Sequence, residues 1–407
     1  MNILLKASFG MLSSSIHITG SKSESNRLLL LQALYPQIIV KNVSDSDDSS
    51  VMTKALESDD SVIDIHHAGT AMRFLTAYFA VTPGREVVLT GSARMKERPI
   101  GILVDALRSL GAKIEYVENE GYPPLRITGA EINSDKVTLK ANISSQYITA
   151  LLLVAAKLKN GLEITLDGEI TSLPYLQMTL NLLNQVGISA TLENNVITVG
   201  PVQQVKPITL TVESDWSSAS YFYSLVALAQ KGTEVSLSSY VQKSLQGDSA
   251  LAEVYKKLGV ETTFNRNTIT LKNIGEVKKQ LDLNLVNTPD IAQTIAVTCF
   301  GLGVGCHLTG LHTLKIKETD RLEALKTELT KLGAVVTVTN NSLTLEPSTH
   351  INSEVAINTY NDHRMAMAFA PLALKTSVII NDAGVVSKSY PSFWDDMQQV
   401  GIAVKTL

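Results

Sequence analysis

Cysteine and long apolar runs are both scarce in this sequence of 407 residues. Cys299 and Cys306 are its two cysteines and share one apolar stretch, which indicates buried free thiols rather than disulfides or reactive thiols. The most apolar segments, such as "ALLLVAAKL", are shorter than the ~18 residues of a membrane-spanning helix. The start, "MNILLKASFG", lacks the pattern of a secretory signal. We therefore expect a cytoplasmic protein.

An excess of positive charge is also missing. The chain has 35 Lys and Arg residues against 39 Asp and Glu residues, and its formal net charge of -4 disfavours nucleic acid as the main partner. Small anions stay possible, because a cleft can concentrate cations that the total conceals. The hydrophobic content of 44% is typical of a globular protein, and the length predicts two domains.

The motifs of common cofactor sites are absent as well. The seven histidines form no H-E-x-x-H pattern, and there is no C-x-x-C pair or G-x-S-x-G elbow. "GLGVG", residues 301–305, lacks the third glycine of the dinucleotide fingerprint. "GSKSESNR" resembles a nucleotide phosphate loop in composition, but Ser21 separates Gly20 from Lys22. The sequence predicts no metal site, and it leaves open which anion this loop binds.

One supersecondary unit recurs along the chain. It consists of an amphipathic helix, a glycine and a strand, and the glycine suits the left-handed residue that ends such a helix. The copies span residues 103–116, 176–192, 251–264, 321–338 and 394–407, and their glycines are Gly111, Gly187, Gly259, Gly333 and Gly401. Residues 50–58 resemble a degenerate sixth copy. Separations of 76, 72, 74 and 68 residues between these glycines indicate an internal repeat.

A second kind of helix precedes each copy and is apolar on nearly every face, which predicts a place inside a core. These helices are expected at residues 27–34, 71–81, 147–158, 219–229, 291–300 and 364–375. Six units, arranged three plus three, would form two similar domains.

Polar segments lie just before these helices and are suited to N-caps. A helix N-terminus has several free N–H donors and roughly half a positive charge. If the buried helices of a domain run parallel, their N-termini converge, and two facing domains then form an anion-binding cleft. The simpler interpretation is that these segments are only helix starts.

Basic residues accumulate at the same places, namely Lys22, Arg27, Arg73, Arg98, Lys317, Arg321, Arg364 and Lys388. Each alone is compatible with a solvated charge. Together they favour two anionic substrates, because phosphate and carboxylate groups pair well with such cations. Asp290, expected to cap the helix that follows it, and Glu318 are candidates for proton transfer among these cations.

The segments "GSKSESNR", "AGTAMR", "ERP", "SSQY", "SLPY", "TPDIA", "KETDR" and "NDHRMAMA" follow one another in this order. This series resembles the signature of the 5-enolpyruvylshikimate-3-phosphate synthases over essentially the whole chain. The resemblance implies an α/β fold with two similar domains, each of three βαβαββ units in an inside-out α/β barrel, and an active site in the interdomain cleft. We place the first domain at residues 14–215 and the second at 1–13 plus 216–407.

The resemblance also implies a reaction. The enolpyruvyl group of phosphoenolpyruvate is transferred to the 5-hydroxyl of shikimate 3-phosphate, and phosphate leaves through a tetrahedral intermediate, on the route to chorismate and aromatic amino acids. The resemblance implies no metal or organic cofactor, and we expect a monomer.

The roles of individual residues follow from the resemblance, motif by motif. The implied ligands of shikimate 3-phosphate are Lys22, Ser23, Arg27, Ser144, Ser145, Gln146, Ser172, Asp290 and Lys317. The implied ligands of phosphoenolpyruvate are Lys22, Gly69, Arg98, Gln146, Arg321, Arg364 and Lys388. Asp290 would accept the 5-hydroxyl proton, and Glu318, helped by Lys22, would protonate the methylene carbon.

Three positions depart from the family pattern: His67, Phe74 and Thr313. They leave open the substrate affinity and the response to glyphosate-like inhibitors. Two alternative functions also stay open. One is enolpyruvyl transfer to UDP-N-acetylglucosamine, whose enzymes usually carry a reactive cysteine in a mobile loop. The other is a non-catalytic anion-binding module, which would have no reason to place Asp290 and Glu318 among its cations.

Overall fold

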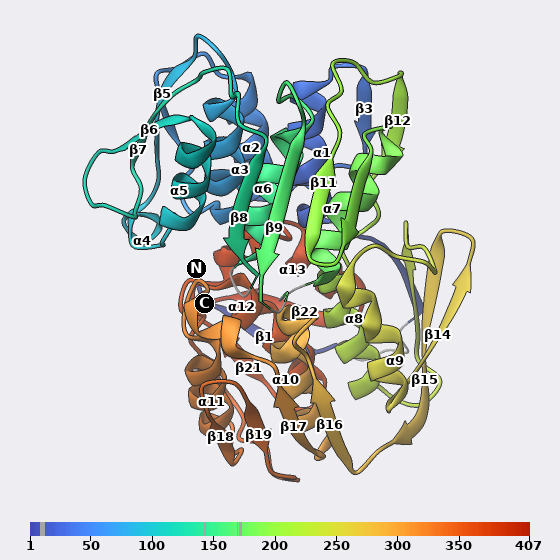
Figure 1. Ribbon diagram of the computed structural model, residues 1–407. Helices are drawn as coiled ribbons and strands as arrows, with labels where there is room; N and C mark the ends of the chain where they lie inside the picture. The colour runs from blue at the N-terminus through green and yellow to red at the C-terminus, as the bar shows by residue number, and fades with distance from the viewer. Residues whose placement is uncertain (9–12, 142–143, 169, 171–172) are drawn as a thin grey trace. The chain divides into compact units, whose positions relative to one another are not determined.

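The computed structural model describes residues 1–8, 13–141, 144–168, 170 and 173–407 of the chain (Figure 1). The chain divides into two compact units. The N-terminal unit comprises Gly20–Val212, and the C-terminal unit comprises Met1–Thr19 with Glu213–Leu407. Within the described residues the strands form six small sheets, three in each unit.

Five of these sheets share one pairing pattern among the described strands. The first two strands are parallel, and the third and fourth are each antiparallel to the strand before them. The N-terminal unit has two four-stranded sheets. The strand order of one is β4 (Val62–Asp64), β5 (Glu86–Thr90), β7 (Leu125–Thr128), β6 (Lys113–Tyr116). The order of the other is β8 (Lys136–Lys140), β9 (Leu162–Asp167), β11 (Val196–Val199), β10 (Ala190–Glu193). Its third sheet is the parallel pair β3 (Ile38–Lys41) and β12 (Ile208–Thr211).

The C-terminal unit has the same pattern three times. Its sheets are β2 (Ser13–His17), β13 (Glu234–Ser238), β15 (Thr268–Val277), β14 (Leu258–Asn265); β16 (Gln280–Asn284), β17 (Gly305–Thr309), β19 (Leu343–Leu345), β18 (Val336–Val338); and β20 (Val355–Ile357), β21 (Val378–Ile380), β1 (Ile3–Ala7), β22 (Ile402–Thr406). Strands β1 and β2 thereby attach the start of the chain to this unit. The domain limits expected from the sequence stay a prediction.

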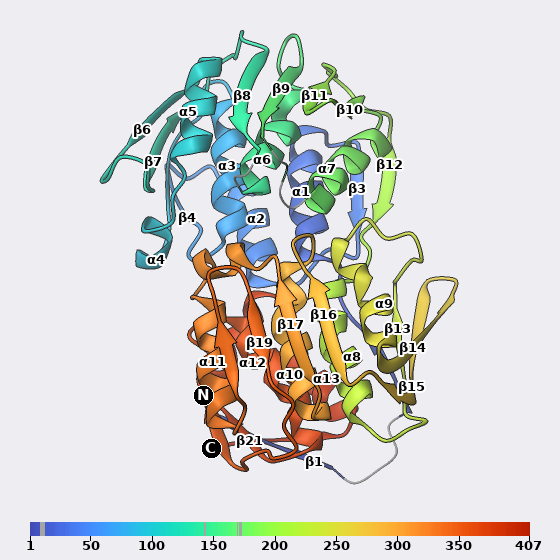
Figure 2. The same cartoon turned by 60° about the horizontal axis from the view of Figure 1, so that its bottom comes forward.

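The helices of the N-terminal unit are α1 (Lys22–Leu34), α2 (Asp47–Glu57), α3 (Gly69–Ala80), α4 (Ala93–Lys96), α5 (Gly101–Leu110), α6 (Ser145–Ala155) and α7 (Leu173–Gln185). Figure 2 shows α1, α3 and α6 next to one another inside this unit, with the partly exposed α2 packed against α1 and α3. Strands β6 and β7 lie toward one outer edge and β12 toward the other. The apolar helices expected from the sequence therefore form the inside of the unit.

The helices of the C-terminal unit are α8 (Trp216–Leu228), α9 (Leu251–Lys256), α10 (Ala292–Leu302), α11 (Arg321–Lys331), α12 (His363–Phe369) and α13 (Phe393–Gln399). Short 3-10 turns join them, namely η1 (Gly247–Ala250), η2 (Pro289–Ile291), η3 (His312–Ile316), η4 (Ala370–Leu374) and η5 (Ala383–Lys388). Every residue of α8 is buried, and α8 packs against α10, which packs against α12. These three helices form the centre of one continuous apolar core.

The repeated glycines have the backbone that the sequence predicted. All five have positive φ angles between +84° and +109°. Gly111, at +109°, ends α5 in the left-handed region, a backbone conformation that residues with a side chain rarely adopt. The prediction of left-handed glycines between helix and strand is confirmed at Gly111, Gly187, Gly333 and Gly401, whereas Gly259 lies inside β14, where the pairing with β15 is irregular.

The expected N-caps are confirmed at only some of the helix starts. Ser144, Asp215 and Asp362 accept a hydrogen bond from an N–H group in the first turn of α6, α8 and α12. At the starts of α1 and α3, the described residues provide no such side-chain bond. Those turns keep backbone donors that no capping side chain satisfies.

Candidate functional site

In the N-terminal unit, Lys22 is held by a carboxylate that the sequence analysis did not identify. Lys22 is the first residue of α1, and its Nζ lies 3.3 Å from Oδ2 of Asp48 in the first turn of α2. Nε2 of His67 lies 3.8 Å from the other oxygen of Asp48, and the Asp48 side chain is only 8% exposed. The starts of α1 and α2 therefore converge, and Asp48 sets the position of the lysine. The run "SDSDDSS" gave no signal of which acid faces inward.

Arg27 ties three helices together. Its Nε donates to Oγ1 of Thr179 at 2.8 Å, and its Nη2 donates to Oγ1 of Thr149 at 3.5 Å and to the carbonyl of Tyr175 at 3.3 Å. Its Nη1 donates to the carbonyl of Ser23 at 2.6 Å. Burial lowers the pKa of Arg27 to about 10. Since these bonds go to hydroxyl and carbonyl oxygens, an incoming anion would be its natural counter-charge.

Arg98 packs directly on Gly69, the first residue of α3. A Cβ atom on Gly69 would lie 2.5 Å from Nη1 of Arg98, so only glycine lets the guanidinium approach this closely. The neighbouring Arg73 donates to the carbonyl oxygens of Gly69, at 3.1 Å, and of Pro99, at 3.0 Å. Burial, and next the charge of Arg98, lower the pKa of Arg73 to about 10. Two arginines side by side at a helix start favour a bound anion.

The start of α6 meets the start of α3. Nε2 of Gln146 donates to Oγ1 of Thr70 at 3.3 Å, and Oγ of Ser144 accepts from the N–H of Gln146 at 3.4 Å. Ser145 is buried. Ser172, the further serine expected to bind a phosphate, lies outside the described residues. The expected residues of the N-terminal unit thus gather around the first turns of α1, α3 and α6.

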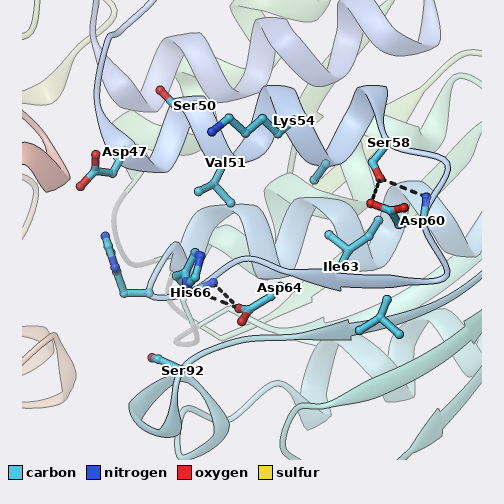
Figure 3. A pocket seen from close by; sticks show the side chains of 13 residues that line it. Asp47, Ser50, Val51, Lys54, Ser58, Asp60, Ile63, Asp64, His66 and Ser92 are labelled. Atoms are coloured by element: carbon cyan, nitrogen blue, oxygen red, sulfur yellow. Dashed lines mark hydrogen bonds and ion pairs between the residues drawn. The ribbon is translucent and has the colours of Figure 1, made fainter.

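A cavity of about 720 Å³ lies beside this group, between α2 and β4 (Figure 3). Its lining includes Asp60 and Asp64 as well as Lys54, and Figure 3 shows Asp64 with His66 at its floor. Among the lining residues carboxylates outnumber lysines, so the cavity does not have the cationic excess that a phosphate site requires. The N-terminal group of cations, rather than this cavity, matches the anion site expected from the sequence.

In the C-terminal unit, Asp290 lies among three cations. Oδ1 of Asp290 is 3.0 Å from Nη1 of Arg321 and 3.5 Å from Nζ of Lys317, and Oδ2 is 3.3 Å from Nη2 of Arg364. Nη1 of Arg364 also donates to the carbonyl of Asp290 at 3.1 Å. The Asp290 side chain keeps 15% of its surface exposed, so a substrate hydroxyl has access to it.

The expectation that Asp290 caps a helix is wrong. It lies within η2, and α10 begins only at Ala292 with Ile291 at the capping position. Pro289 begins a tight 3-10 turn, which directs the carboxylate of Asp290 toward the cations instead of the helix. Three cations outweigh one capping bond, because a buried carboxylate is stabilised most by opposite charges.

Arg321 is the most buried of these cations, with a side chain 2% exposed. It pairs with both oxygens of Asp362, at 2.6 Å from Nε and 3.4 Å from Nη2, and with Oε2 of Glu318 at 2.8 Å. Burial alone would lower the pKa of Arg321, but the charges of Asp362, Glu318 and Asp290 outweigh burial and raise it. Glu318, 28% exposed, is thereby fixed beside Asp290.

Lys388 reaches the same region from η5. Its Nζ donates to the carbonyl of Asn361 at 2.7 Å and to Oδ1 of Asn361 at 2.8 Å. Tyr360 and Asn361 both have positive φ angles, of 53° and 56°, which turn the chain sharply just before Asp362. The expected residues of the C-terminal unit are therefore brought together at the starts of α11 and α12. The partner role of Asp362 was missed, because 41 positions separate it from Arg321.

Thr313, one of the three departures, lies in η3. Its buried Oγ1 has no hydrogen-bond partner among the described residues. A buried hydroxyl without a partner is costly, so this position is suited to contact a polar ligand group.

Two further findings concern metals and membranes. Among the described residues no group of His, Cys, Asp and Glu is arranged to hold a metal ion. Within the same part of the chain, no helix is long and apolar enough to cross a membrane. Cys299 and Cys306 are free and buried.

The fold and these side chains define a class: a mixed α/β protein that collects cations and paired carboxylates at the starts of its helices. A sequence model of the family described as EPSP synthase (3-phosphoshikimate 1-carboxyvinyltransferase) matches residues 53–397. A 3-phosphoshikimate 1-carboxyvinyltransferase from Bacteroides fragilis is 49% identical over 411 residues, covering 100% of this chain and 99% of that protein. One from Vibrio atlanticus is 38% identical over 420 residues, covering 96% and 97%. This chain belongs to the EPSP synthase family.

Solved structures show the same fold. The EPSP synthase from Acinetobacter baumannii superposes with a TM-score of 0.82 at 20% identity, covering 100% of both chains. The enolpyruvyl transferase NikO from Streptomyces tendae superposes with a TM-score of 0.75 at 12% identity, covering 99% of this chain and 98% of that one.

Proposed function

We propose that this chain is a 3-phosphoshikimate 1-carboxyvinyltransferase of the shikimate pathway, on the route to aromatic amino acids. It transfers the enolpyruvyl group of phosphoenolpyruvate to the 5-hydroxyl of shikimate 3-phosphate and releases phosphate. The observation that carries this proposal, together with family membership, is the placement of Asp290 and Glu318 among Lys317, Arg321 and Arg364. A site that only bound anions would gain nothing from carboxylates there, since they repel the ligand.

Shikimate 3-phosphate binds first-turn residues of the N-terminal unit in this proposal. Its phosphate is held by Ser144 and Ser145 at the start of α6, together with Ser172. The rest of the molecule contacts Lys22, Ser23, Arg27 and Gln146 and, from the C-terminal unit, Asp290 and Lys317. The support for this assignment is the N-terminus of α6, because such a terminus favours a phosphate, and the buried Arg27 lies next to that helix.

Phosphoenolpyruvate binds the remaining cations. Lys22, Arg98, Arg321, Arg364 and Lys388 neutralise its phosphate and carboxylate, and Gln146 and Gly69 line the same subsite. Arginine suits this ligand, because its planar donors pair with carboxylate and phosphate in two-bond contacts. The approach of Arg98 to Gly69 supports the assignment, since it leaves the guanidinium at a helix start that attracts anions.

The proton transfers use the carboxylates and Lys22. Asp290 takes the proton of the 5-hydroxyl as that oxygen forms a bond to C2 of phosphoenolpyruvate. Glu318, assisted by Lys22, delivers a proton to the methylene carbon C3, which gives the tetrahedral adduct. The adduct then loses a proton from that carbon as the C–O bond to phosphate breaks, and the cations stabilise the departing phosphate.

The finer architecture is also a proposal. Each domain is built from three βαβαββ units as an inside-out α/β barrel, and the shared strand pattern of the sheets supports it. The two groups of residues face each other when the domains, at 14–215 and 1–13 plus 216–407, close on the substrates. We further propose that the enzyme is a monomer in the cytoplasm.

Phosphate release measures this function directly. With phosphoenolpyruvate present, we expect release when shikimate 3-phosphate is added and none with UDP-N-acetylglucosamine. Release with UDP-N-acetylglucosamine but not with shikimate 3-phosphate would assign the chain to enolpyruvyl transfer to UDP-N-acetylglucosamine. No release with either acceptor at saturation would leave only an anion-binding module. Asp282→Asn, at an exposed position on β16, is a control that should keep full activity.

A further inference from the structure

The guanidinium of Arg364 is held from two sides within the C-terminal unit. On one side lies Asp290, with its Oδ2 3.3 Å from Nη2. On the other side Nη2 donates to Oγ of Ser217 at 3.3 Å, and the Ser217 hydroxyl donates in turn to Oδ2 of Asp248. The bonds run in one direction, from the cation through the hydroxyl to a second carboxyl group. The proposed mechanism does not use this carboxyl group.

Asp248 is fixed in place and closed off from water. It is 4% exposed and lies in η1, directly after a loop that is anchored on the first turn of α8. Gln246 forms that anchor, because its Oε1 accepts from the N–H of Trp216 and its Nε2 donates to the carbonyl of Ser214, both at 2.9 Å. Oδ1 of Asp248 is buried and has no hydrogen-bond partner among the described residues. An ionised carboxylate is costly there.

The charges that face Asp248 come from three elements: Asp290 from η2, Arg364 from α12, and Asp215 from the start of α8. Burial raises the pKa of Asp248 to about 7, and the charges of Asp290 and Asp215 act in the same direction. Arg364 and the Ser217 hydroxyl bond oppose them. The proton of Asp248 is therefore exchanged near neutral pH.

We propose that Asp248 is a positioning residue that controls, through Ser217, how strongly Arg364 is held by the protein and therefore how well Arg364 binds the carboxylate of phosphoenolpyruvate. This rests on the proposed function. As an anion, Asp248 joins Asp290 in attracting Arg364, and it repels a third carboxylate. As a neutral acid, Asp248 no longer attracts Arg364, and the charge that then competes with the substrate carboxylate for the guanidinium is that of Asp290. Phosphoenolpyruvate therefore binds better when Asp248 is protonated.

The test compares kcat/KM for phosphoenolpyruvate between Asp248→Asn and the wild type, from about pH 5.5 to about pH 8.5, at saturating shikimate 3-phosphate. Asparagine keeps the size and the acceptor for Ser217 but has no charge. We expect the ratio of variant to wild type to rise about tenfold with a midpoint near pH 7, which corresponds to a coupling of one pKa unit. Ionisation of the substrate itself cancels in this ratio. Asp282→Asn should give a ratio of one throughout.

A ratio that is constant across this pH range, whatever its value, would overturn the proposal, because a merely structural role shifts all points equally. If Asp248→Asn does not fold, Ser217→Ala replaces it. The Ser217 hydroxyl connects Asp248 to Arg364, so its loss should flatten the fall in kcat/KM with rising pH, and an unchanged profile would overturn the proposal. The proposed function fails separately, namely if the wild type releases no phosphate. An unchanged KM for phosphoenolpyruvate in Arg364→Gln would leave the function standing but would overturn this inference.

Discussion

Gly69→Ala probes the close approach of Arg98 to the start of α3. The new Cβ atom would lie 2.5 Å from Nη1, 2.8 Å from Nη2 and 2.9 Å from Cζ of Arg98. Non-bonded carbon atoms prefer ~3.5–4.0 Å, so the guanidinium must withdraw by roughly 1 Å. The backbone can accept the methyl group, because Gly69 begins α3 and has no positive φ. Alanine also has the higher helix propensity.

The expected loss follows from the bonds of Arg98. A hydrogen bond between charged groups contributes about 1.5–3 kcal/mol, so a displaced guanidinium should raise the KM for phosphoenolpyruvate between about tenfold and about 150-fold. Turnover at saturation should change far less, since Asp290 and Glu318 belong to the other unit. The KM for shikimate 3-phosphate should stay the same.

Initial rates of phosphate release, measured against each substrate in turn, give both KM values and kcat, and thermal unfolding gives the stability. Gly200→Ala is the matched control in the same unit, because its new Cβ would lie 3.9 Å from the nearest atoms, an ordinary contact. If Gly69→Ala folds with an unchanged KM for phosphoenolpyruvate, Arg98 does not bind that substrate at this position.

Other substitutions test the C-terminal unit and the closure of the domains. Asp290→Asn should still bind shikimate 3-phosphate in a calorimeter but lose about 10²–10⁴ in kcat, and wild-type turnover would remove Asp290 from its role. Asp362→Ala deprives the buried Arg321 of a two-bond partner. Its free energy of unfolding in urea should fall by about 3 kcal/mol, the low end for a broken buried pair because Glu318 and Asp290 remain; an unchanged midpoint would show that the pair contributes little. The radius of gyration from X-ray scattering should decrease only when both ligands are present, and no decrease would argue against closure.

The sequence predicted those features that depend on neighbouring residues. A glycine after an amphipathic helix and a helix apolar on every side are local patterns, and the backbone at Gly111 and the burial of α8 match them. The starts of α6 and α12 were likewise recognisable from Ser144 and Asp362 as capping residues.

Contacts between side chains far apart in the sequence could not be predicted from such local patterns. Asp48 is one acid in an acidic run, and nothing local distinguishes the one that contacts Lys22. The contact of Arg321 with Asp362 joins two helix starts far apart in sequence. Asp290 looked like a cap because its neighbours are typical of one, but the surrounding cations determine its orientation. Which substrate each residue binds stays a prediction from the family resemblance.

The most direct test of the central claim is the identification of both products in one reaction. The purified chain is incubated with phosphoenolpyruvate and shikimate 3-phosphate, and the mixture is analysed for phosphate and, by mass spectrometry, for the enolpyruvyl ether of shikimate 3-phosphate. We predict one molecule of ether for each phosphate released, and neither product when one substrate is omitted. Phosphate released without ether, or with no need for shikimate 3-phosphate, would contradict enolpyruvyl transfer.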